Sequence, residues 1–417
     1  MTKKSGRYSP FRPVFLKPRC VMGLFGPSGP AAAEDVLRGK AALTAMGIGT
    51  SYVPASACAD PDRLDRRPSA PDGAPGAEAV PPRRGAPPAP ESGVGDAAGV
   101  GRAFAGAETS GAPPGLLAGP GPPGAPGIPG SSGFPGIFGP PGPPSREGAS
   151  GAGRAYLAGA DEIRLMGLLE MMDNPGVSEL LAVRGGFGAM RLLKDLLPFW
   201  HVFPRNKPIV GFSDVTALHL ARLRATGTGG WHAPNLTTFA RLLPAEAARA
   251  LAVMRGEDEG AWEFDAPDVM VPGEAAGPLV GGNLTVFASM WGSPYCPSTE
   301  DTLLLLEDVN EQPYSIDRLL TSLSIRRAFK GVKALVFGEF ADCGDPAEIR
   351  AIISECARSA GVPAVAGAPF GHGDRCAPWF YGERAVLSAG RGGGTVAFPG
   401  RGPSLEIPEG FPVEMLI

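Results

Sequence analysis

The stretch Lys207-Pro208-Ile209-Val210-Gly211-Phe212-Ser213-Asp214-Val215-Thr216 joins a short apolar run to the polar start of a helix. We predict that a β-strand ends at Gly211 and that a helix begins at Asp214, so the chain must turn sharply between them. Ser213 stands at the apex of this turn. Its hydroxyl would lie beside backbone N–H groups at the positive end of the helix dipole, which favours a serine that attacks a carbonyl. These ten residues favour a nucleophile and a simple helix N-cap equally.

Apolar runs alternate with helical patterns along the rest of the chain, which predicts an α/β protein with a parallel sheet. The first run begins at Cys20 and ends in the turn Gly26-Pro27-Ser28-Gly29. A second run ends in the glycine turn 184–188, where backbone N–H groups can approach a ligand closely. This second run is the strand expected at 179–183, and other strands are expected at 50–53, 303–308, 334–340 and 363–366, helices at 31–46, 161–173, 316–329 and 346–359, and a β-meander at 385–417.

Composition limits the classes of partner. The 417 residues suffice for two domains, and the net charge of −4 with a pI near 5.7 argues against nucleic acid and against polybasic membrane binding. No apolar run is long enough to span a bilayer and no signal-peptide pattern stands at the N-terminus, so we expect a cytoplasmic protein. The six cysteines form no CxxC pair. They therefore predict free, mostly buried thiols and neither a disulfide framework nor a zinc site.

The segment 62–154 is dominated by Gly, Pro, Ala and Ser, and we predict a largely disordered insertion there. Within it, glycine recurs at every third position from Gly121 to Gly142. A collagen-like trimerising stretch is one interpretation, but a flexible loop is favoured because so short a triple helix inside a folded domain would be entropically expensive. The expected domains are 14–241, interrupted by this insertion, and 269–417, joined by a linker at 242–268.

Two more polar residues follow apolar strands, Glu307 after four leucines and His372 in a glycine-flanked loop. With Ser213 they give the order Ser, Glu, His of one serine-hydrolase arrangement, in which His372 is the base and Glu307 orients it. From the residues alone, a structural salt bridge from Glu307 to Arg318 is favoured over this role. Val215 replaces the second glycine of a G-x-S-x-G elbow, so an α/β-hydrolase fold is not expected.

The remaining histidines have plainer interpretations. His219 lies one helical turn after Val215 and is expected to be structural, and His201 is expected at the surface. His232 could either line a pocket or pack within a loop.

Seven motifs follow one another along the chain: Gly26-Pro-Ser-Gly29, Tyr156-Leu-Ala-Gly159, Arg184-Gly-Gly-Phe-Gly188, Gly211-Phe-Ser-Asp-Val-Thr216, Gly281-Gly-Asn-Leu284, Leu306-Glu-Asp-Val-Asn-Glu311 and Phe370-Gly-His-Gly373. In this order they resemble the muramoyl-tetrapeptide LD-carboxypeptidase family. The match covers nearly everything outside the Gly/Pro segment. That resemblance implies a flavodoxin-like N-terminal domain, a C-terminal α/β domain of swivelling type and a homodimer.

The resemblance implies a catalytic triad of Ser213, Glu307 and His372 that uses no metal and no cofactor. It implies oxyanion donors at the backbone N–H groups of Asp214 and Gly186, so that Asp214 would matter chiefly for its N–H and not for its carboxylate. Arg184, Asn283 and Ser28 are the residues expected to bind substrate.

The activity implied is removal of the terminal D-alanine from a muropeptide tetrapeptide by cutting an L-to-D amide bond, as in peptidoglycan recycling. One alternative is a microcin C immunity type peptidase acting on peptidyl or aminoacyl nucleotides, which an aromatic-rich loop would favour. Another is a muropeptide binder without catalytic activity, in which the three side chains would not converge.

Overall fold

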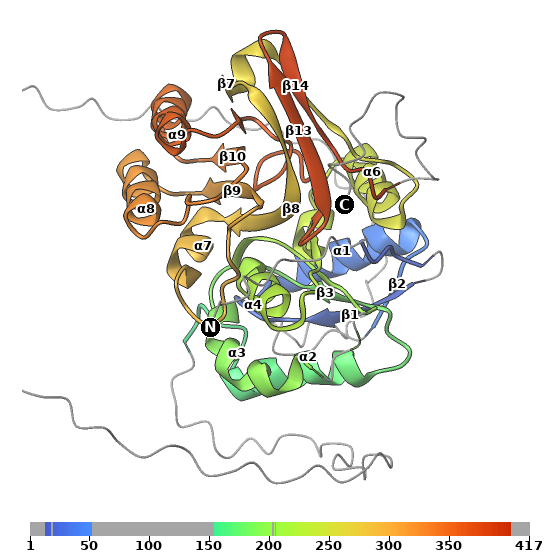
Figure 1. Ribbon diagram of the computed structural model, residues 1–417. Helices are drawn as coiled ribbons and strands as arrows, with labels where there is room; N and C mark the ends of the chain where they lie inside the picture. The colour runs from blue at the N-terminus through green and yellow to red at the C-terminus, as the bar shows by residue number, and fades with distance from the viewer. Residues whose placement is uncertain (1–12, 18–19, 52–153, 202–203, 205, 402–417) are drawn as a thin grey trace, which may run out of the picture. The chain divides into compact units, whose positions relative to one another are not determined.

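The computed structural model of the chain describes residues 13–17, 20–51, 154–201, 204 and 206–401 (Figure 1). The predicted insertion, with its Gly-X-Y triplets, lies outside the described residues except for Arg154. The end of the expected strand at 50–53 and residues 402–417 of the expected meander also lie outside them.

The first sheet carries the Ser213 turn. Five of its six strands are parallel, in the order β5-β4-β3-β1-β2, and β12 pairs antiparallel to β5 at the edge. This confirms the parallel sheet expected from the sequence. The strands are β1 (Val21–Phe25), β2 (Gly49–Thr50), β3 (Glu179–Ala182), β4 (Ile209–Val210), β5 (Trp231–His232) and β12 (Trp379–Phe380).

Helices cover both faces of this sheet, which explains why its strands are apolar without alternation. Leu180 packs into a cluster with side chains of α2, α3 and α4, whereas Leu181 packs into another with side chains of α1 and α6. Successive side chains of a strand point to opposite faces, so both leucines of β3 are buried. The helices are α1 (Ala33–Ala45), α2 (Asp161–Asp173), α3 (Ala189–Leu196), α4 (Thr216–Thr226), α5 (Leu236–Phe239) and α6 (Pro244–Arg255).

The second sheet is mixed and has eight strands in the order β6-β14-β13-β8-β9-β10-β11-β7. The middle strands β8, β9, β10 and β11 run parallel, and the outer strands pair antiparallel. Their bounds are β6 (Trp262–Phe264), β7 (Val269–Val271), β8 (Gly273–Asn283), β9 (Leu303–Val309), β10 (Ala334–Ala341), β11 (Ala364–Val365), β13 (Arg384–Gly390) and β14 (Gly393–Ala397).

Three helices connect the parallel strands of the second sheet and lie on the same side of it (Figure 1). They are α7 (Leu284–Met290), α8 (Pro313–Ile325) and α9 (Pro346–Ala360). The four leucines that begin β9 are fully buried, as expected for a strand covered on both faces. Glu307 follows them directly, so the strand delivers its carboxylate to the end of the sheet.

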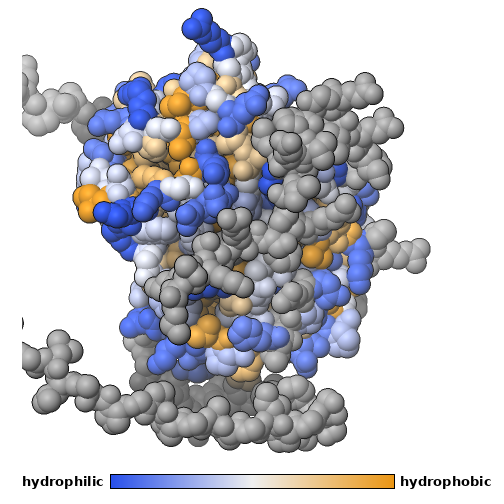
Figure 2. Space-filling model, in the orientation of Figure 1, coloured by the Kyte–Doolittle hydropathy of each residue, from blue (hydrophilic) through white to orange (hydrophobic). Residues whose placement is uncertain are grey.

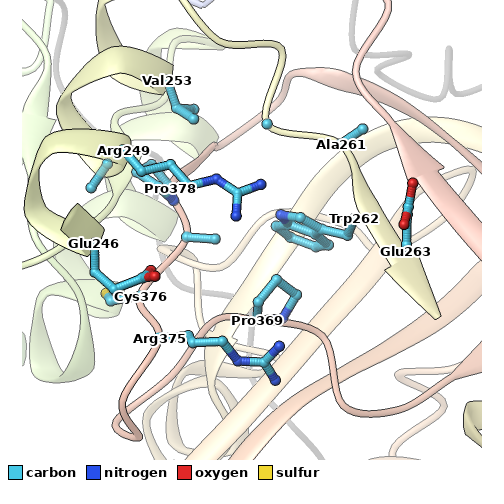
Figure 3. Close-up of a pocket in the computed structure, with 13 residues that line it drawn as sticks. Glu246, Arg249, Val253, Ala261, Trp262, Glu263, Pro369, Arg375, Cys376 and Pro378 are labelled. Atoms are coloured by element: carbon cyan, nitrogen blue, oxygen red, sulfur yellow. The ribbon is translucent and has the colours of Figure 1, made fainter. Parts of the chain in front are cut away.

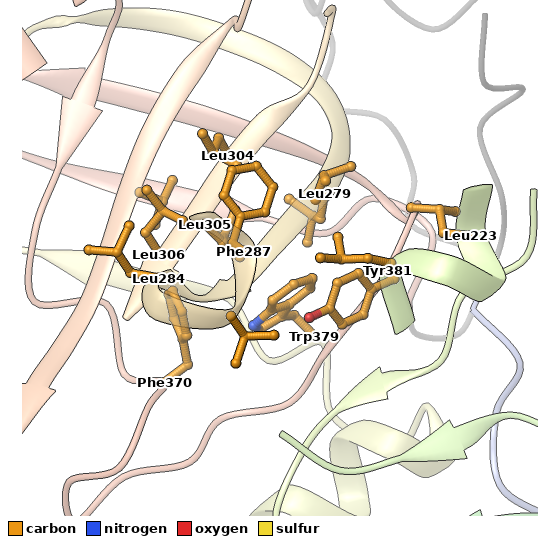
Figure 4. Close-up of a cluster of buried hydrophobic side chains, with 14 of the residues drawn as sticks. Leu223, Leu279, Leu284, Phe287, Leu304, Leu305, Leu306, Phe370, Trp379 and Tyr381 are labelled. Atoms are coloured by element: carbon orange, nitrogen blue, oxygen red, sulfur yellow. The ribbon is translucent and has the colours of Figure 1, made fainter. Parts of the chain in front are cut away.

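The two sheets share a core near the site. Figure 4 shows Trp379, Tyr381 and Phe370 packed with leucines of β8 and β9 and with Leu223 of α4. The Tyr381 hydroxyl donates a hydrogen bond of 3.0 Å to the carbonyl of Gly281 at the end of β8. These contacts join the helix that follows Ser213 to the sheet that carries Glu307.

The order of strands does not follow the order of the chain. β12 comes from the region expected to be the C-terminal domain, yet it completes the first sheet, with Trp379 opposite His232. The segment expected as a linker, 242–268, contains α6, β6 and the 3-10 turn η5 (Ala266–Asp268). The domain boundaries 14–241, 242–268 and 269–417 stay predictions.

The exposed surface has mixed polarity. On the face shown in Figure 2, hydrophobic side chains are scattered among hydrophilic ones, as on most water-exposed protein surfaces. Among the described residues, no helix combines the length and the apolar character needed to cross a bilayer.

Candidate active site

Ser213 lies in the sharp turn that its neighbours predict. β4 ends at Val210, the 3-10 turn η4 spans Ser213–Val215, and α4 follows at Thr216. Ser213 has φ of +64°, a left-handed conformation that costs a non-glycine residue about 1–3 kcal/mol and recurs at functional sites. The residue before this turn is Phe212, and no side chain caps η4 or α4. The N-cap interpretation of Ser213 is therefore wrong.

Gly211 permits the turn because no other residue fits there. Its φ is +155°, and a Cβ atom at this position would lie 2.7 Å from Asn235 Oδ1 and 3.0 Å from Ala182 Cβ. The same Asn235 oxygen accepts a hydrogen bond from the Phe212 N–H at 3.3 Å. The strand end is thus anchored immediately before Ser213.

The glycine turn after β3 packs directly against Ser213. A Cβ atom on Gly185 would lie 2.8 Å from Ser213 Oγ, so only a glycine lets the backbone come this close. The Gly29 N–H donates to the Gly185 carbonyl at 3.1 Å, and Gly186 has φ of +115°. Sequence reasoning placed its weight on Gly186, whereas Gly185 is the residue that contacts Ser213. The oxyanion roles of Gly186 and of the Asp214 N–H stay predictions.

Asp214 uses its carboxylate, contrary to the expectation that it matters chiefly for its N–H. Its Oδ2 accepts hydrogen bonds from Ser28 Oγ at 2.6 Å and from the N–H of Ala189, the first residue of α3, at 2.8 Å. Burial raises the pKa of this carboxyl, and the hydrogen bond from Ser28 opposes that rise. Ser28 is fully buried and its hydroxyl holds Asp214, and its substrate-binding role stays a prediction.

Glu307 and His372 form a hydrogen-bonded pair. Glu307 is fully buried, and its Oε2 lies 2.7 Å from His372 Nδ1, while the His372 side chain keeps 17% of its surface exposed. Gly371, with φ of +130°, lets the loop pass close to Glu307. A hydrogen bond at Nδ1 leaves the other ring nitrogen, Nε2, to act as the base.

The alternative salt bridge from Glu307 to Arg318 is wrong. The Arg318 guanidinium donates to Ser315 Oγ at 3.2 Å and lies over the ring of Tyr314. A buried carboxylate needs a partner, and His372 supplies it.

Phe212 connects the serine turn to the histidine. Its ring centroid lies 4.6 Å from that of His372, and Ser213 is the next residue in the chain. In the described part of the chain, Ser213 Oγ and His372 are not joined by a hydrogen bond. Such contacts are often long without substrate and tighten in the reacting complex, so this geometry is compatible with a serine and its base.

Asn283, expected to bind substrate, supports the site from inside the protein. It is buried at the N-terminus of α7, where its Oδ1 accepts from the Val286 N–H and its Nδ2 donates to Asp308 at 2.9 Å. Its own N–H donates to Thr216 Oγ1 at 3.2 Å, which ties β8 to the start of α4. Burial, followed by the nearby charge of Glu307, raises the pKa of Asp308 to about 6.

Arg184 and Arg164 hold the loops around the turn. Arg184 is exposed, and its guanidinium donates to the Pro30 carbonyl at 2.8 Å. Arg164 of α2 is fully buried and donates to the carbonyls of Gly188, at 3.0 Å, and Pro27. Sequence reasoning missed Arg164, although its spacing of four from the buried Leu168 was a usable signal.

The other histidines take structural positions. His219 is fully buried with Nε2 2.9 Å from the Gly211 carbonyl, and burial lowers its pKa to about 3, which confirms a structural role. His232 stacks on Trp379 with ring centroids 4.8 Å apart and is also fully buried, so it packs and does not line a pocket. His201 is exposed, as expected.

The sequence predicted free, mostly buried thiols and no zinc site. The five cysteines that the structure describes are free, and all except Cys356 are buried. Within the described ranges, His, Cys, Asp and Glu side chains form no group of three or more that could hold a metal ion.

Two regions of the chain match known domains. Residues 140–233 match the LD-carboxypeptidase N-terminal domain, and residues 276–387 match the LD-carboxypeptidase C-terminal domain. These regions contain Ser213, Glu307 and His372.

Relatives match most of the chain outside the Gly/Pro segment. The murein tetrapeptide carboxypeptidase of Pseudomonas aeruginosa is 31% identical over 57% of this chain and 80% of its own length. A protein of Bacillus subtilis described as a probable murein peptide carboxypeptidase is 32% identical over 54% of this chain and 72% of its own. The microcin C7 self-immunity protein MccF of Escherichia coli is 24% identical over 45% of this chain and 64% of its own.

Solved structures share the fold. The muramoyltetrapeptide carboxypeptidase from Oxalobacter formigenes superimposes with a TM-score of 0.59 at 21% identity, covering 90% of this chain and 97% of that one. An MccF-like protein from Bacillus anthracis gives a TM-score of 0.61 at 19% identity, covering 93% and 99%. These similarities confirm the predicted α/β class with two sheets, and the flavodoxin-like and swivelling-type labels stay predictions.

Proposed function

The chain belongs to the LD-carboxypeptidase family, and we propose that it is a serine carboxypeptidase that releases terminal D-alanine from muropeptide tetrapeptides. The observation that carries this proposal is the buried Glu307–His372 hydrogen bond of 2.7 Å, which lies beside the left-handed Ser213 turn. A serine in strained backbone, a histidine oriented by a buried acid and a close glycine turn are the parts that acyl transfer needs.

In the proposed reaction, Ser213 Oγ attacks the carbonyl of the third residue while His372 Nε2 takes the hydroxyl proton. The negative charge that develops on the carbonyl oxygen would be bound by the backbone N–H groups of Asp214 and Gly186. His372 then gives the proton to the leaving amine, so D-alanine departs and an acyl-serine remains. Water, deprotonated by His372, cleaves that ester and restores Ser213.

Glu307 acts on His372 in both halves of this reaction. Its carboxylate accepts the Nδ1–H bond, which keeps Nε2 available for the proton transfers, and it stabilises the imidazolium that forms when His372 takes the proton. Because the carboxylate is fully buried, its attraction for a charged imidazole is weakly screened.

The defining experiment measures release of D-alanine from L-Ala-D-Glu-meso-diaminopimelate-D-Ala. We expect Ser213→Ala to lower kcat by more than about 1000-fold, because the nucleophile is removed. Ser388→Ala, which changes an exposed serine of β13, is the matched control and should act like the wild type. Wild-type release of D-alanine by Ser213→Ala would show that the nucleophile is another group.

A second candidate is a microcin C immunity type peptidase, and one observation favours it. Tyr156 and Phe187 are both largely exposed, and their rings lie 6.0 Å apart beside the glycine turn, where a nucleobase could stack. Turnover of an aminoacyl nucleotide faster than of the tetrapeptide would favour this alternative. The third interpretation, a muropeptide binder, predicts no turnover of either substrate.

We further propose a cytoplasmic homodimer. α2 exposes Ile163 and Met166 at 55% and 52%, and the segment after α3 exposes Leu197 and Phe199, which gives apolar surface that a second subunit could cover. Sedimentation velocity would show a monomer if the proposed dimer is wrong.

Cell fractionation tests the proposed cytoplasmic location.

A further inference from the structure

A cavity of about 360 Å³ lies between α6, the start of β6 and the loop that carries His372 (Figure 3). Its lining includes Trp262, Cys376 and the side chains of two arginines, Arg249 and Arg375, but none of Ser213, Glu307 and His372. This volume falls in the range of small-molecule sites. The cavity is therefore separate from the residues that would perform the reaction.

Two hydrogen-bond donors line this cavity, Trp262 and Arg249, whose side chain is 60% exposed. The Trp262 side chain is buried, and in the described structure its Nε1 atom has no hydrogen-bond partner. Arg249 extends its guanidinium from α6 towards the same indole (Figure 3). Its ion pair with Asp258 is long, 3.7 Å from Nε to Oδ2. A buried N–H favours an acceptor, and a guanidinium beside it favours an acceptor with negative charge.

The cavity also offers a negative group. Glu246 precedes Arg249 on α6 by one helical turn, and its carboxylate turns into the space between α6 and the loop (Figure 3). Of the other charged lining residues, Arg375 is paired with Glu339 at 3.4 Å and Glu263 points away from the cavity. A positive and a negative group on one helix face suit a ligand that carries both charges.

We propose that this cavity binds the zwitterionic head of an α-amino acid. Its carboxylate lies between the Arg249 guanidinium and Trp262 Nε1–H, and its ammonium faces Glu246. Two sources share this chemistry. One is a free amino acid such as D-alanine. The other is the side-chain end of diaminopimelate within the substrate, and this second source rests on the proposed function.

The cavity is connected to the catalytic loop. Trp262 stacks on Phe370 with ring centroids 5.5 Å apart, and Phe370 precedes His372 by two residues. Pro369 and Arg375, on either side of His372 in the chain, belong to the lining. A ligand bound against Trp262 and Pro369 would therefore contact the loop that presents His372.

Binding is tested by calorimetry on the full chain carrying Ser213→Ala, so that no turnover interferes. The probes are D-alanine and meso-diaminopimelate, and the control probes are D-alaninamide and 1,5-diaminopentane, which lack the carboxylates. We expect saturable binding of at least one of the carboxylate probes and none of the control probes. Adding Arg249→Gln should raise Kd about 10- to 100-fold, because a charged hydrogen bond is lost.

Two further variants separate specific contacts from general effects. Trp262→Phe keeps an aromatic ring but removes the N–H, and should raise Kd about 2- to 10-fold. Arg391→Gln changes an exposed arginine in the β13–β14 turn and should leave Kd unchanged. No binding of either carboxylate probe, or equal Kd values with and without Arg249→Gln, would overturn the proposal.

Turnover with Ser213 intact then identifies the source of the ligand. If the head belongs to the substrate, Arg249→Gln raises KM for the diaminopimelate tetrapeptide but not for the same peptide with L-lysine at position three. If the ligand is free, both KM values stay unchanged while D-alanine binding is still lost. Failure of turnover itself would count against the proposed function alone, because the binding measurement does not depend on catalysis.

Discussion

Replacing Glu307 by glutamine is the most direct probe of the site. The change keeps the size of the side chain but removes the negative charge that lies 2.7 Å from His372 Nδ1. Between unit charges at that separation the attraction is about 6 kcal/mol with an effective dielectric constant of about 20. Part of this is offset by the solvation that the ionised carboxylate forgoes on burial, so about 3–5 kcal/mol remains to stabilise the imidazolium.

A loss of this size corresponds to a drop in kcat/KM of about 10²- to 10⁴-fold. The assay is D-alanine release, with kcat and KM measured separately. Most of the change should fall on kcat, because the imidazolium forms only during reaction. Glu348→Gln, an exposed change on α9, serves as the control. If Glu307→Gln stays within about threefold of wild type, Glu307 does not assist His372 and the triad assignment is refuted.

Two other predictions concern the turn. Gly185→Ala places a methyl group 2.8 Å from Ser213 Oγ and should abolish most D-alanine release. The control Gly392→Ala, which has open space around it, should keep wild-type release. Equal activities of the two variants would contradict the close approach of Gly185 to Ser213. His219, with a pKa of about 3 in the fold, binds fewer protons there than when unfolded between pH 3 and 6.5, so its contribution to stability is lost as the pH falls. The free energy of unfolding should therefore rise less steeply with pH in His219→Gln than in the wild type, by about 1.4 kcal/mol per pH unit across that window. Chemical unfolding at several pH values measures this slope, and an unchanged slope would show that His219 does not titrate this way.

Much of the local structure could be predicted from the sequence. The four leucines before Glu307, the glycines around Ser213 and the helix at 161–173 all lie where periodicity and backbone constraints place them. These features depend on residues a few positions apart, so a local pattern is enough to find them. On α2, Arg164 and Met171 are buried together with Leu168 and Met172, whereas Leu165 and Leu169 are only half-buried.

The supports of the site could not be predicted in this way. The carboxylate of Asp214 caps α3, which begins 25 residues earlier in the chain, and Ser28 reaches it across 186 residues. Nothing in the neighbourhood of Asp214 distinguishes a residue used for its N–H from one used for its side chain. Only the packing of α3 against the serine turn decides it.

Local residue patterns were enough to predict an α/β protein with a serine at a strand-to-helix turn and an acid and a histidine after later strands. Tertiary structure decided that Glu307 pairs with His372 and not with Arg318, that β12 completes the first sheet, and that Trp262 and Arg249 face one cavity. The reason is physical. Turn and strand preferences are encoded in neighbouring residues, whereas partners for buried polar groups are chosen among segments that meet only when the whole chain has folded.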